Sequence, residues 1–289
     1  MNGILLVDKE PGWTSSDVVV KLKGILHERR IGHSGTLDPM ATGLLTVFVG
    51  RATRAVEFAE HDTKRYLASL RLGITTDTQD ITGNILEEKP VCISSDALEA
   101  VLSRFLGEQE QIPPMYSAIR VGGKRLYEIA RKGGEIRRPP RPITIHELRL
   151  TGRDGEDWLL DVKCSKGTYI RTLCHDIGQS LGCGGCMSAL RRTEVGAFSV
   201  RDAIPIGEVQ RLKDEGRIEE RLLPTDALFS REMSCTATEL QTKRIRCGSE
   251  YPTECADGIY RVYDQGGAFL MLGRAEAGVM KTIKNFFEV

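Results

Sequence analysis

The sequence lacks any long apolar run: none approaches the roughly 18 residues that a membrane-spanning helix needs. It also lacks an excess of charge of either sign, because 40 Lys and Arg balance 40 Asp and Glu. This balance disfavours a non-specific nucleic-acid binder, which is usually basic overall, but it leaves room for a local basic groove. The segment Met1–Lys9 has no basic leader and no cleavage pattern. We therefore expect a buried strand there, no membrane association and a cytoplasmic location.

Nucleotide-binding and metal-binding signatures are also scarce. The Gly-rich stretch 31–42 contains neither a Gly-x-Gly-x-x-Gly nor a Walker pattern, which disfavours a phosphate cradle for a nucleotide. Eight cysteines are scattered without a disulfide framework. Cys183 and Cys186 have the CxxC spacing, with Cys174 and His175 upstream. A zinc site would need four converging ligands and no second CxxC exists, so we expect ordinary thiols and no metal.

The hydrophobic pattern alternates between strand-like and helix-like periods, which is typical of an α+β fold. Thr14 or Ser15 can cap a helix that reaches Leu26. The stretches 31–42 and 75–84 have no period and are expected to be loops. The apolar period predicts strands over 1–9, 44–49, 66–72, 143–150 and 159–164, and further helices over 51–60, 98–106 and 170–181.

A domain boundary is expected near 223–230, which divides the chain into residues 1–228 and 229–289. The second part carries a predicted helix over 237–244 and short predicted strands over 259–263, 268–272 and 279–283. A unit of this size is marginal on its own, so we expect it to dock on the first part.

One loop carries an acidic residue in a rigid setting. Asp38 lies in the run Gly-His-Ser-Gly-Thr-Leu-Asp-Pro-Met-Ala-Thr-Gly over 32–43. A lone Asp in a Gly-rich loop is usually a turn former, and local context alone favours that interpretation. However, Pro39 fixes the backbone after the Asp, the glycines allow another backbone to approach, and a buried strand follows directly.

The run 32–43 resembles the active-site motif of the TruB family, the bacterial tRNA pseudouridine-55 synthases. Further stretches resemble other motifs of the family in the same order, at residues 9–15, 64–78, 111–118 and 164–171, with Leu-Arg-Arg at 190–192 downstream. The resemblance implies a pseudouridine synthase catalytic domain, built on a mixed and mostly antiparallel sheet flanked by helices. It also implies a small β-rich, PUA-like RNA-binding domain at the C-terminus, for which a plain stabilising cap is the alternative.

The resemblance assigns roles to individual residues. Asp38 matches the catalytic aspartate, Tyr66 a tyrosine that contacts the target base and is a candidate general base, and Arg171 the arginine that pairs with the aspartate. Without the resemblance, the sequence pattern would predict that Tyr66 is a core tyrosine and that Arg171 is a solvated charge on a helix. Three further positions match residues that line the uracil pocket or meet the RNA where the flipped base left the stack, namely Tyr169, Leu190 and His33.

The chemistry makes these residue types sensible. Pseudouridine formation breaks the bond from N1 to C1′, turns the uracil and joins C5 to C1′. It is an isomerisation, so the resemblance implies neither a redox cofactor nor ATP. The carboxylate must be ionised to act as nucleophile or base. Burial alone would raise its pKa and a nearby guanidinium opposes this, so an arginine beside Asp38 is expected on physical grounds.

Residues 131–142 hold five basic residues and one acidic residue, a local excess in a chain of balanced charge. A charge run is usually a solvated loop, but the Gly pair permits hinging and the prolines keep the exit extended. We interpret the segment as an arm that grips phosphates, within an RNA-clasping insertion that the resemblance places at about 120–142. The residues expected to contact RNA there are Lys124, Arg131, Lys132, Arg137, Arg138 and Arg141.

The leading hypothesis is a standalone enzyme, acting as a monomer, that makes pseudouridine at position 55 in the T loop of tRNA. A guide-RNA-dependent relative that modifies ribosomal RNA is one alternative, and the basic arm favours the standalone type. A tRNA-folding chaperone without catalysis is the other, and the retained Asp38, Tyr66 and Arg171 argue against it.

Overall fold

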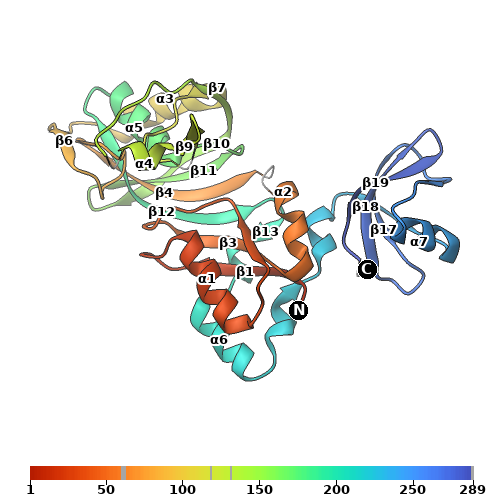
Figure 1. Ribbon diagram of the computed structural model, residues 1–289. Helices are drawn as coiled ribbons and strands as arrows, with labels where there is room; N and C mark the ends of the chain where they lie inside the picture. The colour runs from red at the N-terminus through yellow and green to blue at the C-terminus, as the bar shows by residue number, and fades with distance from the viewer. Residues whose placement is uncertain (60–62, 118, 131, 288–289) are drawn as a thin grey trace.

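The structure is a computed structural model that describes residues 1–59, 63–117, 119–130 and 132–287. Its main body is a mixed sheet of ten strands flanked by helices, and a second sheet of five strands stands at the C-terminal end (Figure 1). The α+β prediction is thus confirmed. In sheet order the main strands are β14 (Leu222–Leu223), β1 (Gly3–Lys9), β3 (Thr42–Val49), β12 (Gly185–Val195), β4 (Lys64–Leu72), β11 (Asp157–Cys164), β10 (Arg141–Asp154) and β7 (Gly107–Gln111), with β2 (Ile31–Ser34) beside β3 and β13 (Phe198–Ser199) beside β12.

Helices cover the two halves of this sheet separately (Figure 1). One apolar core lies between the β1–β3 half and the helices α1 and α6, and another between the β4–β11 half and the helices α3 and α5. The helices of the main body are α1 (Ser15–Leu26), η1 (Gly50–Ala55), α2 (Val56–Ala59), α3 (Ser95–Leu102), η2 (Ser103–Phe105), α5 (Ile170–Ser180), η3 (Val200–Asp202), α6 (Ile206–Asp214), η4 (Ile218–Arg221) and η5 (Thr225–Phe229).

The first helix shows how local sequence positions the site. The Thr14 hydroxyl accepts a hydrogen bond from the backbone N–H of Asp17, and the Asp17 carboxylate accepts one from the N–H of Thr14. This reciprocal cap satisfies two backbone donors at the helix start. It directs the chain from β1 into α1, so that Ser15 is buried beneath the loop that carries Asp38.

The two halves of the sheet meet at one short parallel pairing. Strand β12 pairs with β3 only through Arg191 opposite Thr42 and Arg192 opposite Gly43. Gly43 has φ +97, and a Cβ there would lie 2.3 Å from the carbonyl oxygen of Arg192, so only glycine fits. The remaining neighbours of the sheet pair antiparallel.

Two sequence predictions need correction. The stretch 31–42 is not wholly a loop, because residues 31–34 form strand β2 along β3. The stretch 75–84 overlaps a small hairpin of β5 (Ile74–Thr76) and β6 (Ile85–Glu88). The central strand β12 had no prediction, because charged residues interrupt its alternation and its burial comes from neighbours on both sides. In the described chain, no helix is long and apolar enough to span a bilayer.

The C-terminal sheet docks on the main body through aromatic packing. Phe229 of η5 packs against Phe58, Phe269 and Phe286, with ring centroids 5.3–6.2 Å apart. Arg54 donates to the Asn285 side-chain oxygen at 2.6 Å. The elements of this part are β15 (Met233–Thr236), α7 (Glu239–Arg246), β16 (Tyr251–Pro252), β17 (Gly258–Tyr263), β18 (Phe269–Glu276) and β19 (Val279–Asn285).

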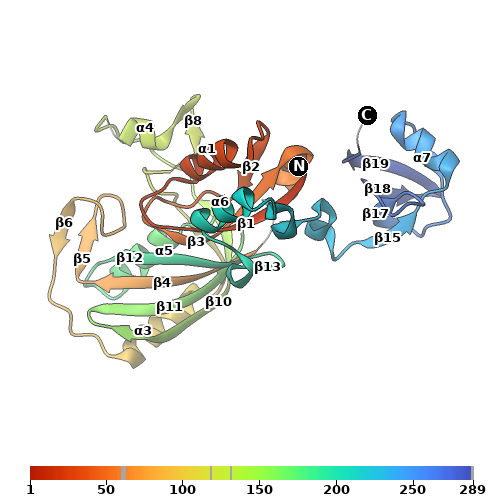
Figure 2. The ribbon, with the colours of Figure 1, turned by 90° about the horizontal axis from the view of Figure 1, so that it is seen from below.

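Between β7 and β10 the chain leaves the sheet. It forms a hairpin of β8 (Arg120–Val121) and β9 (Lys124–Arg125), followed by α4 (Leu126–Ala130). In Figure 2, which views the molecule from below, α4 and β8 project beyond the large sheet. This excursion contains most of the stretch, about 120–142, in which an RNA-clasping insertion is expected.

Candidate active site

Asp38 lies in the loop between β2 and β3, and hydrogen bonds fix its neighbours on both sides. The Ser15 hydroxyl accepts a hydrogen bond from the backbone N–H of Leu37 at 2.9 Å. The buried ammonium of Lys9 donates to the Pro39 carbonyl at 3.2 Å. The Asp38 side chain is one-third exposed, since 33% of its surface is accessible. A carboxylate with a fixed backbone and an open side can meet a substrate without reorganisation.

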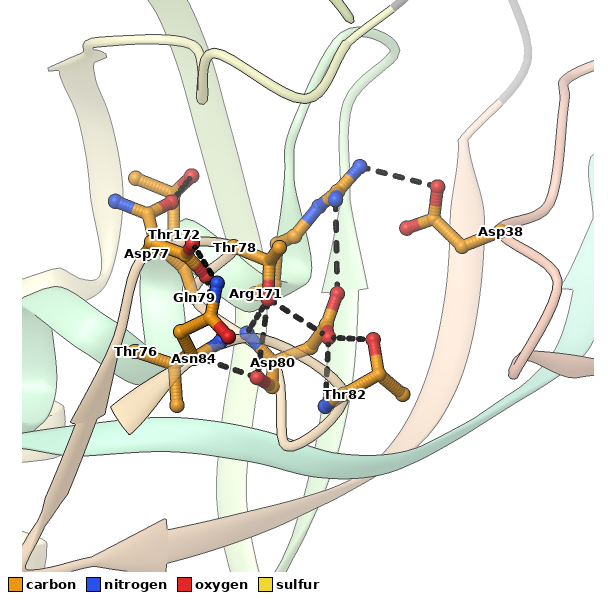
Figure 3. A network of polar contacts seen from close by, with 10 residues as sticks. All are labelled: Asp38, Thr76, Asp77, Thr78, Gln79, Asp80, Thr82, Asn84, Arg171 and Thr172. Carbon is orange, nitrogen blue, oxygen red and sulfur yellow. Dashed lines mark hydrogen bonds and ion pairs between the residues drawn. The ribbon is translucent and has the colours of Figure 1, made fainter. Parts of the chain in front are cut away.

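The partner of this carboxylate is Arg171, near the start of α5. Its Nη2 lies 3.0 Å from the Asp38 Oδ1, and its side chain is only 7% exposed. Its Nη1 lies 3.6 Å from the Oδ2 of Asp80, which is buried as well. The guanidinium thus bridges two carboxylates, as Figure 3 shows. A solvated helix charge would make neither contact.

Asp80 is a site residue that the sequence analysis does not single out, because it lies in a stretch, 75–84, that is expected to be a polar loop and it falls just after the motif at 64–78. Its Oδ1 accepts hydrogen bonds from the backbone N–H of Thr82 at 3.0 Å and from the Thr78 hydroxyl at 3.0 Å. Gln79, at φ +65, accepts from the Thr172 hydroxyl of α5 at 2.7 Å. The sequence feature that could have indicated Asp80 is its position between Thr78 and Thr82, a pattern typical of turns that side chains stabilise. Only the fold shows that the turn faces Arg171.

The charges around Asp38 oppose one another. Burial raises the pKa of the Asp38 carboxyl, the Arg171 guanidinium lowers it, Asp80 raises it and the Lys9 ammonium lowers it. Burial also lowers the pKa of Lys9 to about 8, although Asp38 opposes that shift. The two cations therefore offset the cost of keeping a carboxylate ionised in a half-buried place.

Tyr66 is on β4 and is 7% exposed, so it belongs to the core, as its strand pattern indicates. Burial raises the pKa of Tyr66 to about 12, with the Arg192 guanidinium opposing the shift. At neutral pH the phenol is therefore protonated. Leu37, Tyr66 and Leu190 belong to one apolar cluster beside the loop of Asp38.

Tyr169 precedes α5 and is anchored by Gln111 of β7. The Gln111 side chain accepts from the N–H of Tyr169 at 2.8 Å and donates to its carbonyl at 3.1 Å. The Tyr169 ring centroid lies 5.9 Å from the Arg171 guanidinium carbon. The structure thus gathers Asp38, Tyr66, Arg171, Tyr169 and Leu190 around one place. His33 is half-buried on β2, which leads into the loop of Asp38.

The basic arm is largely solvated in its described part. Lys132, Arg137 and Arg141 are exposed, and Arg138 pairs with the exposed Glu135 at 3.5 Å. Arg131 lies outside the described residues. Lys124 lies on β9 opposite Val121, and its side chain lies outside the described part. Burial raises the pKa of Tyr169, while Ser117 and Arg141, at the two ends of the excursion, contribute to lowering it. Arg141, where the chain rejoins the sheet, lies opposite Gln111, and Gln111 is hydrogen-bonded to Tyr169. The excursion therefore leaves and rejoins the sheet beside Tyr169.

The cysteines do not form a metal centre in the described chain. Cys174, Cys183 and Cys186 are buried free thiols, and burial raises the pKa of Cys186 to about 11. Across the described residues, no group of three or more His, Cys, Asp or Glu side chains is placed to hold a metal ion. A protonated buried thiol is an inert apolar group.

Comparison with known proteins identifies the family to which the chain belongs. Residues 23–170 match the N-terminal domain of the TruB family pseudouridylate synthases, and residues 171–230 match the C-terminal domain of tRNA pseudouridylate synthase B. The chain belongs to the TruB family of pseudouridylate synthases.

Its similar relatives include the tRNA pseudouridine synthase B of Alkaliphilus oremlandii, 46% identical over 92% of this chain and 88% of that protein. The protein of the same name from Clostridium kluyveri is 41% identical over 99% of this chain and 100% of that protein. A chain from the crystal structure of a Cbf5-Nop10-Gar1 complex has the same fold, with a TM-score of 0.75, 25% identity, and coverage of 99% of this chain and 85% of that one.

Proposed function

We propose that this chain isomerises uridine to pseudouridine at position 55 in the T loop of tRNA, with Asp38 as the catalytic carboxylate. The single observation that carries the assignment is the buried Arg171 guanidinium between Asp38 and Asp80. A carboxylate that is open on one side and held ionised by a fixed cation suits attack on, or proton removal from, a bound nucleotide.

The base must leave its stack to reach Asp38, because the carboxylate is mostly buried in the loop between β2 and β3. Tyr66 offers an aromatic face for the uracil, worth roughly 1–3 kcal/mol by stacking. Its protonated phenol is suited to hydrogen bonding with the base and not to acting as a phenolate base at neutral pH. Leu190 and Tyr169 complete the pocket wall, and His33 would meet the RNA at the site's edge.

The arm supplies affinity. Lys132, Arg137 and Arg141 are exposed cations on the excursion, which leaves and rejoins the sheet at Gln111 and Arg141, beside Tyr169. They would therefore neutralise phosphates near the flipped nucleotide. The arm favours an enzyme that grips tRNA itself over one that relies on a guide RNA. We assign residues 229–289 to a PUA-like domain that extends this RNA-binding surface.

We further propose that the enzyme acts as a monomer in the cytoplasm. Asp38, Arg171 and Asp80 all come from one chain, so the catalytic group needs no second copy. The reaction needs no redox cofactor, because the bonds broken and formed leave the oxidation state of the nucleotide unchanged.

The test is direct. The pure protein is incubated with an unmodified tRNA transcript, and pseudouridine is mapped by position. We expect product at position 55, and Asp38→Asn should abolish turnover while tRNA affinity stays within about tenfold, roughly 1.4 kcal/mol. Binding without product from any tRNA would support a folding chaperone. Product only with an added guide RNA would support the ribosomal RNA alternative. Full activity of Asp38→Asn would refute the catalytic assignment.

A further inference from the structure

Arg192, on the central strand β12, is a fully buried cation. It is 1% exposed, and it is among the largest side chains that the fold buries completely. Within the described ranges, no Asp or Glu lies within salt-bridge distance of its guanidinium. A buried charge without a counter-ion is costly unless its donors are satisfied in another way. The contacts that satisfy this guanidinium therefore indicate what it does.

Two of these contacts lie at the ends of the loop that carries Asp38. The Nη2 of Arg192 donates to the carbonyl of Gly35 at 2.9 Å, just before the acidic residue. The Nε donates to the carbonyl of Leu44 at 2.7 Å, just after the loop has entered β3. The Arg192 side chain thus connects the start of the Asp38 loop to its end. The loop has a third fixed point here, in addition to those at Leu37 and Pro39.

The third neighbour is Tyr66. Across β12 and β4, the Cα of Arg192 lies directly opposite that of Tyr66. Across β12 and β3, the same residue lies opposite Gly43. The Arg192 guanidinium opposes the rise that burial causes in the pKa of Tyr66, and the Tyr66 phenol opposes the fall that burial causes in the pKa of Arg192. Arg192 therefore stands between the strand that carries Tyr66 and the loop that carries Asp38.

We propose that Arg192 is a positioning residue of the active site: it sets the distance between the Asp38 loop and the Tyr66 hydroxyl across the junction of the two half-sheets. The inference rests on the proposed function. The junction needs such a group, because only two residue pairs join β12 to β3. A planar guanidinium donates in several fixed directions at once, whereas an ammonium on a flexible stem does not hold that geometry.

The experiment replaces Arg192 by lysine, which keeps the positive charge but loses the planar guanidinium with its several fixed donors. The matched control is Arg191→Lys, on the same strand, because the Arg191 guanidinium pairs with Asp8 at 2.7 and 3.0 Å, away from Tyr66. Single-turnover and steady-state rates are measured with a tRNA transcript, together with tRNA affinity. For Arg192→Lys we expect kcat to fall at least thirtyfold while KM and Kd stay within threefold. The control should stay within twofold on every measure. A kcat within threefold of the unmodified protein would overturn the proposal, and so would a loss confined to KM.

A double-mutant cycle tests the link to Tyr66. If Arg192 acts partly through the phenol hydroxyl, Arg192→Lys should cost at least fivefold less in kcat in a Tyr66→Phe background than in the unmodified protein. A purely structural residue would cost the same factor in both backgrounds. Equal losses would therefore refute the link to Tyr66.

A second variant keeps Arg192 itself, in case Arg192→Lys does not fold. A Cβ at Gly35, which has φ +66, would lie 3.1 Å from the Arg192 Nη1 and 3.3 Å from the Lys64 Cε, so Gly35→Ala crowds the guanidinium without removing it. Gly155→Ala is the control, because Gly155 has φ +56 and open space around it, so it carries the same backbone strain alone. We expect at least a tenfold loss of kcat for Gly35→Ala at unchanged tRNA affinity, and under twofold for the control. Equal effects would overturn the proposal.

The two hypotheses fail in different ways. An unmodified protein that makes no pseudouridine contradicts the proposed function. An active unmodified protein whose Arg192 and Gly35 variants retain kcat contradicts only the role of Arg192.

Discussion

The contact between Arg171 and Asp80 makes the sharpest prediction. The substitution is Asp80→Asn, which keeps an oxygen for the N–H of Thr82 and the hydroxyl of Thr78 but removes the charge opposite Arg171. Two unit charges 3.6 Å apart attract by about 4–5 kcal/mol at an effective dielectric constant of about 20. Part of that energy is offset, because the freed guanidinium regains solvation or shifts its contact with Asp38.

We expect about 2.7 kcal/mol of this to appear in the transition state, which is about a hundredfold in kcat. The reason is that Arg171 then has one fixed carboxylate partner in place of two, so its position beside Asp38 is no longer determined. Binding of tRNA should change less than threefold, because Asp80 is 4% exposed and cannot contact the RNA. The assay is single-turnover pseudouridine formation with saturating enzyme, alongside a filter-binding affinity.

Asp77→Asn is the matched control. Asp77 lies in the same loop, and its carboxylate accepts from the backbone and side-chain nitrogens of Asn84 rather than from an arginine. It should keep kcat within threefold. If Asp80→Asn also keeps kcat within fivefold, or if both variants lose activity equally, the Arg171 guanidinium does not depend on Asp80 for its position and the argument is wrong.

Three further predictions follow from the same structure. Burial raises the pKa of Asp38 more than Arg171 lowers it, so the acid limb of the pH profile of kcat/KM should lie above the ordinary aspartate range. Arg171→Gln should move this limb to higher pH, and a limb that stays in place would contradict the reasoning. Replacing Lys132 and Arg137 by glutamine should lower the slope of log affinity against log salt by about 2, with kcat at saturating tRNA unchanged; an unchanged slope would remove both from the RNA contact. Phe229→Ala should lower the free energy of unfolding by about 3–5 kcal/mol in a denaturant titration, because Phe229 packs against three other rings between the two sheets. A loss below about 1 kcal/mol would mean that the C-terminal part does not dock through Phe229.

Local patterns were enough for most elements of the fold. The cap at Thr14, the apolar stripe of α1 and the alternation in β4 and β11 are readable because each depends on near neighbours in the chain. Strand β12 is one exception, as are helix α6 and the short strands β2, β5 and β6. Strand β12 is the centre of the sheet, yet its sequence interleaves arginines with apolar residues. Those arginines are accommodated by partners from β1, β3, β4 and the loop of Asp38.

The candidate site, like the fold, has features that the sequence determines and features that only the tertiary structure determines. The sequence by itself determined that Asp38 stands in a rigid Gly-rich loop before a buried strand, and its motifs indicated the family to which the chain belongs. It could not determine that Arg171 is buried, that Asp80 holds its other side, or that Arg192 has no carboxylate among the described residues. Those facts arise from residues that are far apart in the chain, such as positions 38 and 171 or 35 and 192. Burial and pairing of charge depend on what packs around a group in space, and only the tertiary structure decides that.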